Sequence, residues 1–532
     1  MNPPIYNQIL KNPEITHNII TSKSDSFLKK YFTPAVLIVF CLLIVLARVH
    51  TYEEPLERDI TTYAVIAHEM LEGRELYSDL VDIKPPGVFL TYAAMELITG
   101  YGINSIFLLN IIAAVITLIG VYYAGMILSR ERSEGGIWAA LCWTIISGNL
   151  VFQANQPNIE VILNACLIWS FVLFIKDDWF HGYRKAIIIG LLIAIASIHK
   201  QIAIIALILM GGIFIIITPS PKRSQALGHI FVMWGIVIGI WLGIFGYFAI
   251  SERFKEFHDV VFLYTRFYAG DLIKNLIKGI SLEGLYPITM PFILPLLISS
   301  VLGMAIGFLK RNSLWIYLLV YAISCQIMVS LPGKFFPHYY QLWLPILAVG
   351  FGSAFIELKE IIKPQWKWVS HVLAALVVTS LLYYQLPLYK LSPLEWSRRK
   401  YGDFFISTKE LAMELDKLLK PEETFYEWGA ESGLYFYSKR RPPTGTFLFF
   451  PLIDGPLVQK LSQRVIEDLK REEPELLIMP PEVPINHQVI AWLSSQPWEL
   501  LRWDNNADNY FSIYVRGGGN LELRLIEETS YN

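Results

Sequence analysis

The chain has 532 residues, of which 54% are hydrophobic and 17% are charged, and its formal net charge is −2. Soluble domains carry about 25% charged residues, so this composition indicates an integral membrane protein. A net charge near zero argues against a general nucleic-acid binder. The four cysteines lie inside apolar runs without metal-ligand spacing, which argues against a zinc site and a disulfide framework.

The first apolar run, Thr33–Val49, follows a polar segment of residues 1–32 that we place in the cytoplasm. The run ends in Arg48-Val49-His50 rather than in a small-residue cleavage site. It is therefore expected to stay in the protein as a first membrane span.

A strongly acidic loop, residues 51–85, follows this span and holds nine acids against three bases. Carboxylates gathered at one boundary between water and lipid indicate a functional site. Apolar residues at helical spacing predict an amphipathic helix over Ile60–Glu72 that lies on the membrane, with Asp59 as its N-cap. Asp59 would then stabilise the helix, and a carboxylate held beside Glu57 and Arg58 could also act as a general base. The two roles are compatible.

The loop ends in Asp82-Ile83-Lys84-Pro85-Pro86, in which the two prolines restrict the backbone after Lys84. A lysine at this boundary can be a simple interfacial anchor. An ammonium held here beside Asp82 would equally suit the phosphate of a lipid-linked substrate.

Further apolar runs long enough for membrane spans predict about eleven crossings. Ala186–Thr218 is expected to form two short helices that meet at the polar break His199-Lys200-Gln201, and Pro86–Gly100 is expected to be a partial helix. The other predicted spans are Ile103–Leu128, Gly135–Phe152, Asn158–Ile175, Leu227–Ile250, Pro287–Leu309, Ser313–Leu331, Tyr339–Ile356 and Trp368–Leu386.

Several polar groups interrupt these spans or begin them. His199, Lys200 and Gln201 either break a helix structurally or line a wet cavity. Glu160 lies one turn inside its span, an unusual place for a carboxylate. His338 and Tyr339 precede another span, either as interfacial aromatic residues or as part of a site.

Basic residues fall in alternate short loops, which the positive-inside rule places in the cytoplasm. The acidic loop, the His199 break, the segment 251–286, the loop 334–338 and everything after residue 386 then share the outer face. Polar features far apart in the sequence would thus meet on one face of the membrane.

The composition changes near Tyr389, where proline, charged residues and short strand-like runs appear. Two helical patterns, Phe404–Leu419 and Val458–Leu469, alternate with these runs and predict a soluble α/β domain over 389–532 on the outer side. The strand-like runs are Thr424–Trp428, Leu434–Tyr437, Glu475–Met479 and Tyr510–Val515.

The sequence holds no G-x-S-x-G, H-E-x-x-H, paired C-x-x-C or P-loop motif, so hydrolase, zinc-protease and ATPase functions have no support. The early Asp59, the helix ending Glu69-Met70-Leu71-Glu72-Gly73 and the Lys84-Pro85-Pro86 motif resemble the GT-C superfamily of membrane glycosyltransferases. Bacterial relatives of the dolichyl-phosphate-mannose–protein mannosyltransferases and the lipid A aminoarabinose transferase are the most similar members. The resemblance covers 33–388, and His338-Tyr339 with Leu344-Pro345 resembles a later motif.

The resemblance implies a fold of about 11–13 membrane helices and an inverting hexosyl- or pentosyltransferase of the plasma membrane. A polyprenyl-phosphate sugar would be the donor, and a lipid, glycan or protein hydroxyl at the outer face the acceptor. Asp59 would be the base, with Glu57 as the next candidate, and Lys84, Arg58 and Lys200 would bind the donor phosphate. The other substrate-binding candidates are Tyr63, Asp82, Glu160, His199, Gln201, His338 and Tyr339.

This chain departs from the family pattern in one respect. Relatives often carry a second acid beside the loop aspartate, whereas Ile60 follows Asp59 here. The neighbouring acid is Glu57 instead, so the resemblance defines neither the partner of Asp59 nor a metal site. A divalent metal ion stays possible, and no cofactor and no metal ligands are assigned.

Two other classes of function compete with sugar transfer. A secondary transporter or lipid-linked sugar flippase would predict repeated halves and ionisable residues near the middle of the membrane. A non-catalytic scaffold would leave Asp59 and Lys84 without a role. The polar groups collect at one face and no internal repeat is found, which favours the transferase.

Overall fold

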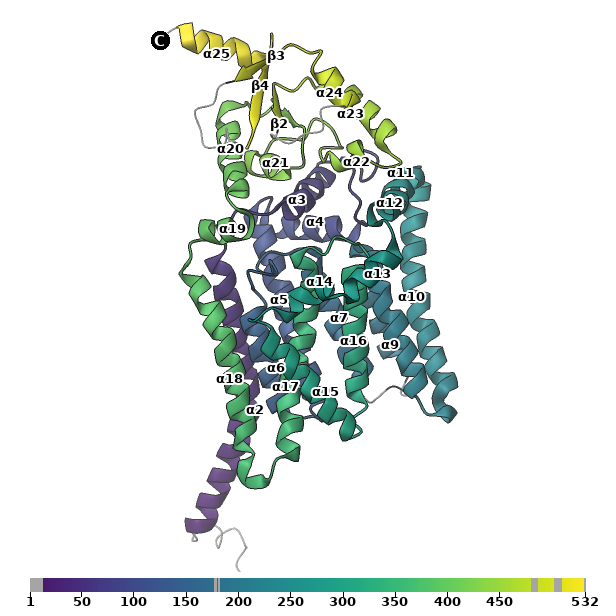
Figure 1. Cartoon of the computed structure of the whole chain (residues 1–532), viewed down its shortest axis with the longest axis vertical. Coiled ribbons are helices and arrows are strands. Elements are labelled where there is room, and N and C mark those ends of the chain that lie inside the picture. Colours follow the sequence, from purple (N-terminus) through teal and green to yellow (C-terminus); the bar gives the residue numbers. More distant parts are fainter. Residues whose placement is uncertain (1–12, 177–178, 180–181, 480–486, 502–509, 531–532) are drawn as a thin grey trace, which may run out of the picture.

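A computed structural model describes residues 13–530, apart from 177–178, 180–181, 480–486 and 502–509. The described chain forms a block of long helices with a smaller domain at one end (Figure 1). The domain contains a four-stranded sheet. A multi-pass helical membrane protein with a C-terminal α/β domain is therefore confirmed as the fold class, whereas the exact domain boundaries stay a prediction.

The helices of the block follow the predicted spans. In the described part of the chain, five helices are long and apolar enough to cross a bilayer, or six if a bent pair of helices forms one span. Other apolar helices are shorter. The count of about eleven crossings stays a prediction. The block consists of α2 (Pro13–His50), α5 (Ile103–Leu128), α6 (Ser133–Ile146), α7 (Ile159–Ile175), α8 (Arg184–His199), α9 (Ile204–Ile217), α10 (Arg223–Ile250), α15 (Leu294–Leu309), α16 (Leu314–Ser330), α17 (Trp343–Ile361) and α18 (Trp368–Gln385).

Helix α17 is the most buried long helix of the block and packs against α5, α6 and α15. Glycines allow this close approach. A Cβ atom at Gly352 would lie 2.4 Å from the carbonyl oxygen of Gly135, and one at Gly303 would lie 2.5 Å from the Cβ of Ala354. Small residues at such contacts let helix backbones approach closely, as is common between membrane helices.

The basic turns share the end of the block that lies away from the C-terminal domain (Figure 1). Lys310, in the turn from α15 to α16, lies 3.8 Å from Glu357 and 3.7 Å from Glu360 near the end of α17. Arg132, between α5 and α6, pairs with Glu360. The positive-inside rule makes this end cytoplasmic, which stays a prediction about orientation.

Short helices cover the opposite end of the block. Helix α4 is too short to cross the membrane and packs beside α3, and the predicted break is confirmed because η1 separates α8 from α9. The short helices and turns are α3 (Arg58–Leu71), α4 (Gly87–Thr99), η1 (Gln201–Ala203), α11 (Phe254–His258), η3 (Asp259–Tyr264), α12 (Thr265–Ala269), α13 (Leu272–Ile280), α14 (Leu282–Leu285), η4 (Tyr286–Thr289) and η5 (Pro337–Leu342); η2 (Ser220–Lys222) and η6 (Pro364–Trp366) lie at the basic end, and η7 (Leu386–Lys390) follows α18.

The structure corrects two expectations about α3. The helix begins at Arg58, with Glu57 as its N-cap residue, so Asp59 lies inside the first turn and is not the cap. The backbone N–H of Thr61 donates to the carbonyl oxygen of Glu57 at 3.2 Å, which closes a turn earlier than predicted. The helix also does not lie on the lipid surface, because it packs between α4 and α21 of the C-terminal domain and is buried along most of its length.

In the C-terminal domain the sheet order is β1-β2-β4-β3, with β1 parallel to β2 and the other two pairs antiparallel. Tyr426 pairs with Leu477, which pairs with Tyr514, and Tyr514 pairs with Leu500. The elements are α19 (Pro393–Tyr401), α20 (Phe404–Leu418), β1 (Phe425–Glu427), α21 (Ser432–Ser438), α22 (Phe450–Ile453), α23 (Val458–Glu472), β2 (Leu476–Met479), α24 (Gln488–Leu493), β3 (Trp498–Leu501), β4 (Ser512–Arg516) and α25 (Asn520–Ser530).

The strand predicted at Leu434–Tyr437 is wrong, because these residues belong to α21. Their run of four apolar and aromatic residues has no alternation, and such a short run does not distinguish a strand from a buried helix. Strand β3 was not predicted. The two helical patterns of the domain are confirmed as α20 and α23.

Candidate active site

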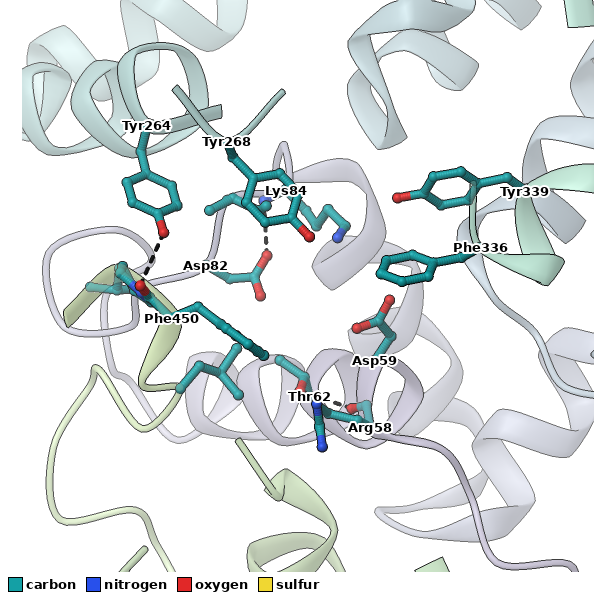
Figure 2. Close-up of a pocket in the computed structure, with 14 residues that line it drawn as sticks. Arg58, Asp59, Thr62, Asp82, Lys84, Tyr264, Tyr268, Phe336, Tyr339 and Phe450 are labelled. Atoms are coloured by element: carbon teal, nitrogen blue, oxygen red, sulfur yellow. Dashed lines mark hydrogen bonds between the residues drawn. The ribbon is translucent and has the colours of Figure 1, made fainter. Parts of the chain in front are cut away.

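A cavity of about 150 Å³ lies where the end of the helix block that carries the short helices meets the C-terminal domain. Four parts of the membrane region contribute to it: α3, the segment before α4, the π-helical turn with α12, and η5 with the residue before it. The domain closes it with α22 and Leu448. The lining residues are Arg58, Asp59, Thr62, Val81, Asp82, Ile83, Lys84, Tyr264, Tyr268, Phe336, Tyr339, Leu448, Phe450 and Pro451 (Figure 2).

Asp59 presents its carboxylate to this cavity from the first turn of α3. Within the described residues, no hydrogen bond or ion pair engages the carboxylate. Burial would raise its pKa, but nearby basic groups, Lys84 above all and then His338, Arg58 and Lys200, outweigh burial and lower it. Asp59 is therefore an ionised and unengaged acceptor at neutral pH.

Lys84 reaches the same cavity from the segment between α3 and α4. Its backbone is held tightly: the N–H donates to Asp82 at 2.8 Å, and the carbonyl accepts from the Tyr77 hydroxyl at 2.7 Å. Its ammonium lies 5.9 Å from the ring centre of Tyr63 and pairs with no carboxylate in the described parts of the chain. Burial lowers the pKa of Lys84, but Asp59 and then Asp82 raise it by more than burial lowers it. The net shift of the pKa is upward, so Lys84 stays a cation.

Arg58 lines the cavity but is already engaged. Its guanidinium pairs with Glu431 of the C-terminal domain, through two hydrogen bonds to one carboxylate oxygen. The Ser432 hydroxyl donates to the Arg58 carbonyl at 3.0 Å and bonds the Thr62 hydroxyl at 2.7 Å. The first turn of α3 is thus attached to α21.

Lys200 and Glu160 form a buried pair next to the cavity, with Nζ 2.6 Å from Oε1. The same ammonium lies 3.7 Å from the ring centre of Tyr339, which lines the cavity. His338, the next residue, has Nδ1 3.2 Å from the side-chain oxygen of Gln153. The break between α8 and α9 therefore brings a cation next to a residue that lines the cavity, although Lys200 itself does not line it. A role of Lys200 in phosphate binding stays a prediction.

Three other predicted site residues lie outside the lining and hold structure together. Glu57 accepts from Asn158 at 2.9 Å. His199 bonds the Thr91 hydroxyl at 2.8 Å through Nε2, and Gln201 donates to the carbonyl of Val261 at 3.1 Å. Their roles in substrate binding or catalysis stay predictions.

Comparison with known proteins places this geometry in context. Residues 83–244 match the family model described as dolichyl-phosphate-mannose-protein mannosyltransferase. The crystal structure of ArnT from Cupriavidus metallidurans in the apo state is similar over 90% of this chain and 97% of that chain, with a TM-score of 0.59 at 14% identity. The structure of the same protein bound to undecaprenyl phosphate covers 92% and 99%, with a TM-score of 0.58 at 13% identity. No curated protein sequence matches the chain.

The chain has the GT-C fold. The fold that the resemblance implies is thereby confirmed. The matched residues of the mannosyltransferase model begin one position before Lys84 and include Glu160 and Lys200, but they do not include Asp59.

Sequence reasoning missed several aromatic residues of this candidate site. Tyr264 and Tyr268 lie at and after the π-helical turn between α11 and α12, where one extra residue per turn redirects the side chains. The Tyr264 hydroxyl donates to the carbonyl of Phe450 at 3.1 Å and so joins this turn to the domain. Only the run of aromatic residues in 251–286 could have suggested them.

The described residues contain no group of three or more His, Cys, Asp or Glu side chains placed to hold a metal ion. Two acids of the candidate site, Asp59 and Asp82, line one cavity, but Asp82 accepts from the backbone N–H of Lys84. Burial raises the pKa of Asp82, with Lys84 opposing the shift. The Asp82 carboxyl is thus engaged by the backbone, whereas no hydrogen bond among the described residues engages that of Asp59. The role of Asp59 as the acceptor of a substrate proton stays a prediction.

Proposed function

We propose that this chain transfers a sugar from a polyprenyl-phosphate donor to an acceptor hydroxyl at the outer face of the membrane. One observation carries the proposal: Asp59 and Lys84, from two different segments, face one cavity (Figure 2). Each charged group lacks an ion-pair partner within 4 Å in the part of the chain that the structure describes, so both remain available to substrate.

A polyprenyl-phosphate donor is supported by the similarity to ArnT, which was crystallised with undecaprenyl phosphate. An ammonium held at the membrane boundary suits the donor phosphate. A mostly apolar cavity of about 650 Å³ is lined by Pro86, two residues beyond Lys84, by Leu90 and by five residues of α10 between Ile240 and Phe248. Arg74, Glu75 and Arg253 also line it. We assign this cavity to the hydrocarbon chain of the donor.

In the proposed reaction, Asp59 accepts a hydrogen bond from the acceptor hydroxyl and takes its proton as the oxygen attacks the anomeric carbon. The bond from that carbon to the phosphate oxygen breaks on the opposite side, so the sugar inverts. The polyprenyl phosphate leaves with one additional negative charge, which Lys84 stabilises. Asp59 then releases the proton to water.

The low pKa of Asp59 has a chemical consequence. It keeps the carboxylate ionised, and thus able to orient a hydroxyl, at every physiological pH. A weak base has little driving force to remove a hydroxyl proton early. The proton would therefore move late, when bond formation has already made the hydroxyl acidic.

The test is mass spectrometry of envelope lipids and glycans from cells with the wild-type gene, without it, or with Asp59→Asn. We expect one sugar modification to disappear in both of the last two strains. Asp271→Asn is the matched control, because Asp271 is an exposed N-cap of α13 and asparagine caps about equally well. An unchanged set of glycans and lipids without the gene would refute the proposal.

A further inference from the structure

The segment that precedes α7 is bonded side by side to the segment that precedes α3. Asn158 donates to a carboxyl oxygen of Glu57 at 2.9 Å. Gln156 donates to the carbonyl of Pro55 at 3.1 Å and accepts from the backbone N–H of Glu57 at 3.2 Å. The Asn155 amide donates to Glu54. Three residues of one loop, Asn155, Gln156 and Asn158, are thus bonded to three of the other, Glu54, Pro55 and Glu57.

A lysine from beyond the last membrane helix completes this contact. Lys400, in α19, places its ammonium 2.5 Å from Glu54 Oε1 and 3.1 Å from the Asn155 side-chain oxygen. The side chains of Lys400 and Glu54 are 1% and 0% exposed. Burying two charges is costly unless hydrogen bonds satisfy them, and such pairs define one arrangement of their surroundings more than they add stability.

Both loops lead directly into the candidate active site. Asp59 follows Glu57 by two residues, and Glu160, the partner of Lys200, follows Asn158 by two residues. We propose that Glu54, Asn155, Gln156, Asn158 and Lys400 form a polar brace that positions Asp59 relative to the Glu160–Lys200 pair. The members of the brace are positioning residues, because none of them lines the cavity.

The Lys84 side of the site is held by different contacts. Besides the hydrogen bond from Tyr77 to the Lys84 carbonyl, Thr265 donates to the carbonyl of Ile83 at 3.1 Å. The N–H of Val81 donates to the carbonyl of Gly445 at 2.9 Å. None of these bonds involves a residue of the brace. Loss of the brace should therefore misplace the base and leave the phosphate site intact.

The consequence for catalysis rests on the proposed function. A misplacement of about 1 Å can slow a reaction about 100-fold. In purified protein, Lys400→Met should lower kcat about 10–100-fold and keep the donor KM within about twofold. Tyr77→Phe should do the reverse, raising the donor KM and sparing kcat.

A matched control lies one helix further along. Lys409 of α20 pairs with Glu53 at 3.8 Å and donates to its carbonyl at 3.1 Å, so it joins the same two regions without touching Asn155. Lys409→Met should keep kcat within about twofold. Equal losses of kcat in both variants would mean that the losses come from weaker docking of the domain in general, and would overturn the proposal.

Two further measurements separate the outcomes. Lys400→Met leaves Glu54 as a buried unpaired charge, so a Glu54→Gln/Lys400→Met variant removes both charges. It should melt close to the wild type and still show reduced kcat; wild-type kcat would overturn the proposal.

Hydrogen–deuterium exchange over 54–62 and 153–160 should rise in Lys400→Met but not in Lys409→Met. This readout needs no sugar transfer, so the brace is tested even if the proposed function fails, and unchanged exchange would refute the brace.

Discussion

The guanidinium of Arg58 pairs with the carboxylate of Glu431, and this bond attaches the helix turn that holds Asp59 to the C-terminal domain. Glu427 lies next to this pair, since the backbone N–H of Glu431 donates to it at 3.2 Å. Burial raises the pKa of both glutamates, and Arg58 opposes the shift. The domain is thus part of the cavity wall and also holds in place the helix turn that carries Asp59, the proposed base.

Arg58→Met should therefore destabilise the docked domain. It leaves two buried carboxylates without their cation, at a cost of about 1–3 kcal/mol. Faster proteolysis in the linker around α19 and a lower melting temperature would show this. Arg398→Met is the control, because Arg398 pairs with Asp403 on the exposed surface, where such pairs contribute little. Equal melting of the two variants would contradict a docking role for Arg58.

Lys84 should be required for donor binding. Lys84→Ala is expected to weaken binding of polyprenyl phosphate and slow transfer strongly, because the phosphate loses the cation that faces it. Lys84→Arg should recover only part, since a planar guanidinium places its donors differently from an ammonium. Binding of undecaprenyl phosphate in detergent and the transfer rate measure the two effects. Near-normal values in the alanine variant would reduce Lys84 to an interfacial anchor.

The membrane fold could be predicted from the sequence alone, and so could the importance of the two charged residues that face the cavity, Asp59 and Lys84. Long apolar runs need no tertiary information, and Lys84-Pro85-Pro86 stands out because prolines restrict the backbone beside a charge. The partners of these charges could not be predicted. Arg58 meets Glu431 across 373 positions of sequence, and Lys200 meets Glu160 across 40.

Short elements were the other limit of prediction. The Asp59 cap was wrong because helix starts are uncertain by one or two residues. The strand predicted over Leu434–Tyr437 was wrong because this part of α21 is almost entirely buried. A short apolar run of this kind shows neither strand nor helix periodicity. The polar brace was visible only as an unusual run of amides before Glu160, without any sign of what it would bind.

Glu57 should make stability depend on pH. Burial, reinforced by the charge of Asp59, raises its pKa from 4.5 to about 8. The folded chain therefore keeps a proton that the unfolded chain releases above about pH 4.5, so the free energy of unfolding falls as pH rises from about 4.5 to 8. Glu57→Gln mimics the protonated acid and can still accept a hydrogen bond from Asn158. The free energy of unfolding of this variant should therefore fall less as pH rises over the same range.

The measurement is the melting temperature of wild type and Glu57→Gln at pH 5 and pH 8. The variant should gain on the wild type at pH 8, by about 1.4 kcal/mol for each pH unit over which the folded chain alone keeps the proton. Glu414→Gln is the control, because Glu414 forms an exposed pair with Lys417. Parallel pH profiles for wild type and Glu57→Gln would show that Glu57 is ionised in the folded protein.

Asp59 should matter for the rate and little for the fold. Because it lies inside the first turn of α3 and its carboxylate caps nothing, neither Asp59→Asn nor Asp59→Ala loses a capping bond. Both variants should melt near the wild type and bind undecaprenyl phosphate, yet transfer sugar about 10²–10⁴-fold more slowly, the usual contribution of a general base. Single-turnover transfer with a preloaded donor isolates this step from donor binding. Wild-type rates in the asparagine variant would remove Asp59 from the mechanism and leave Glu57 as the next carboxylate to test.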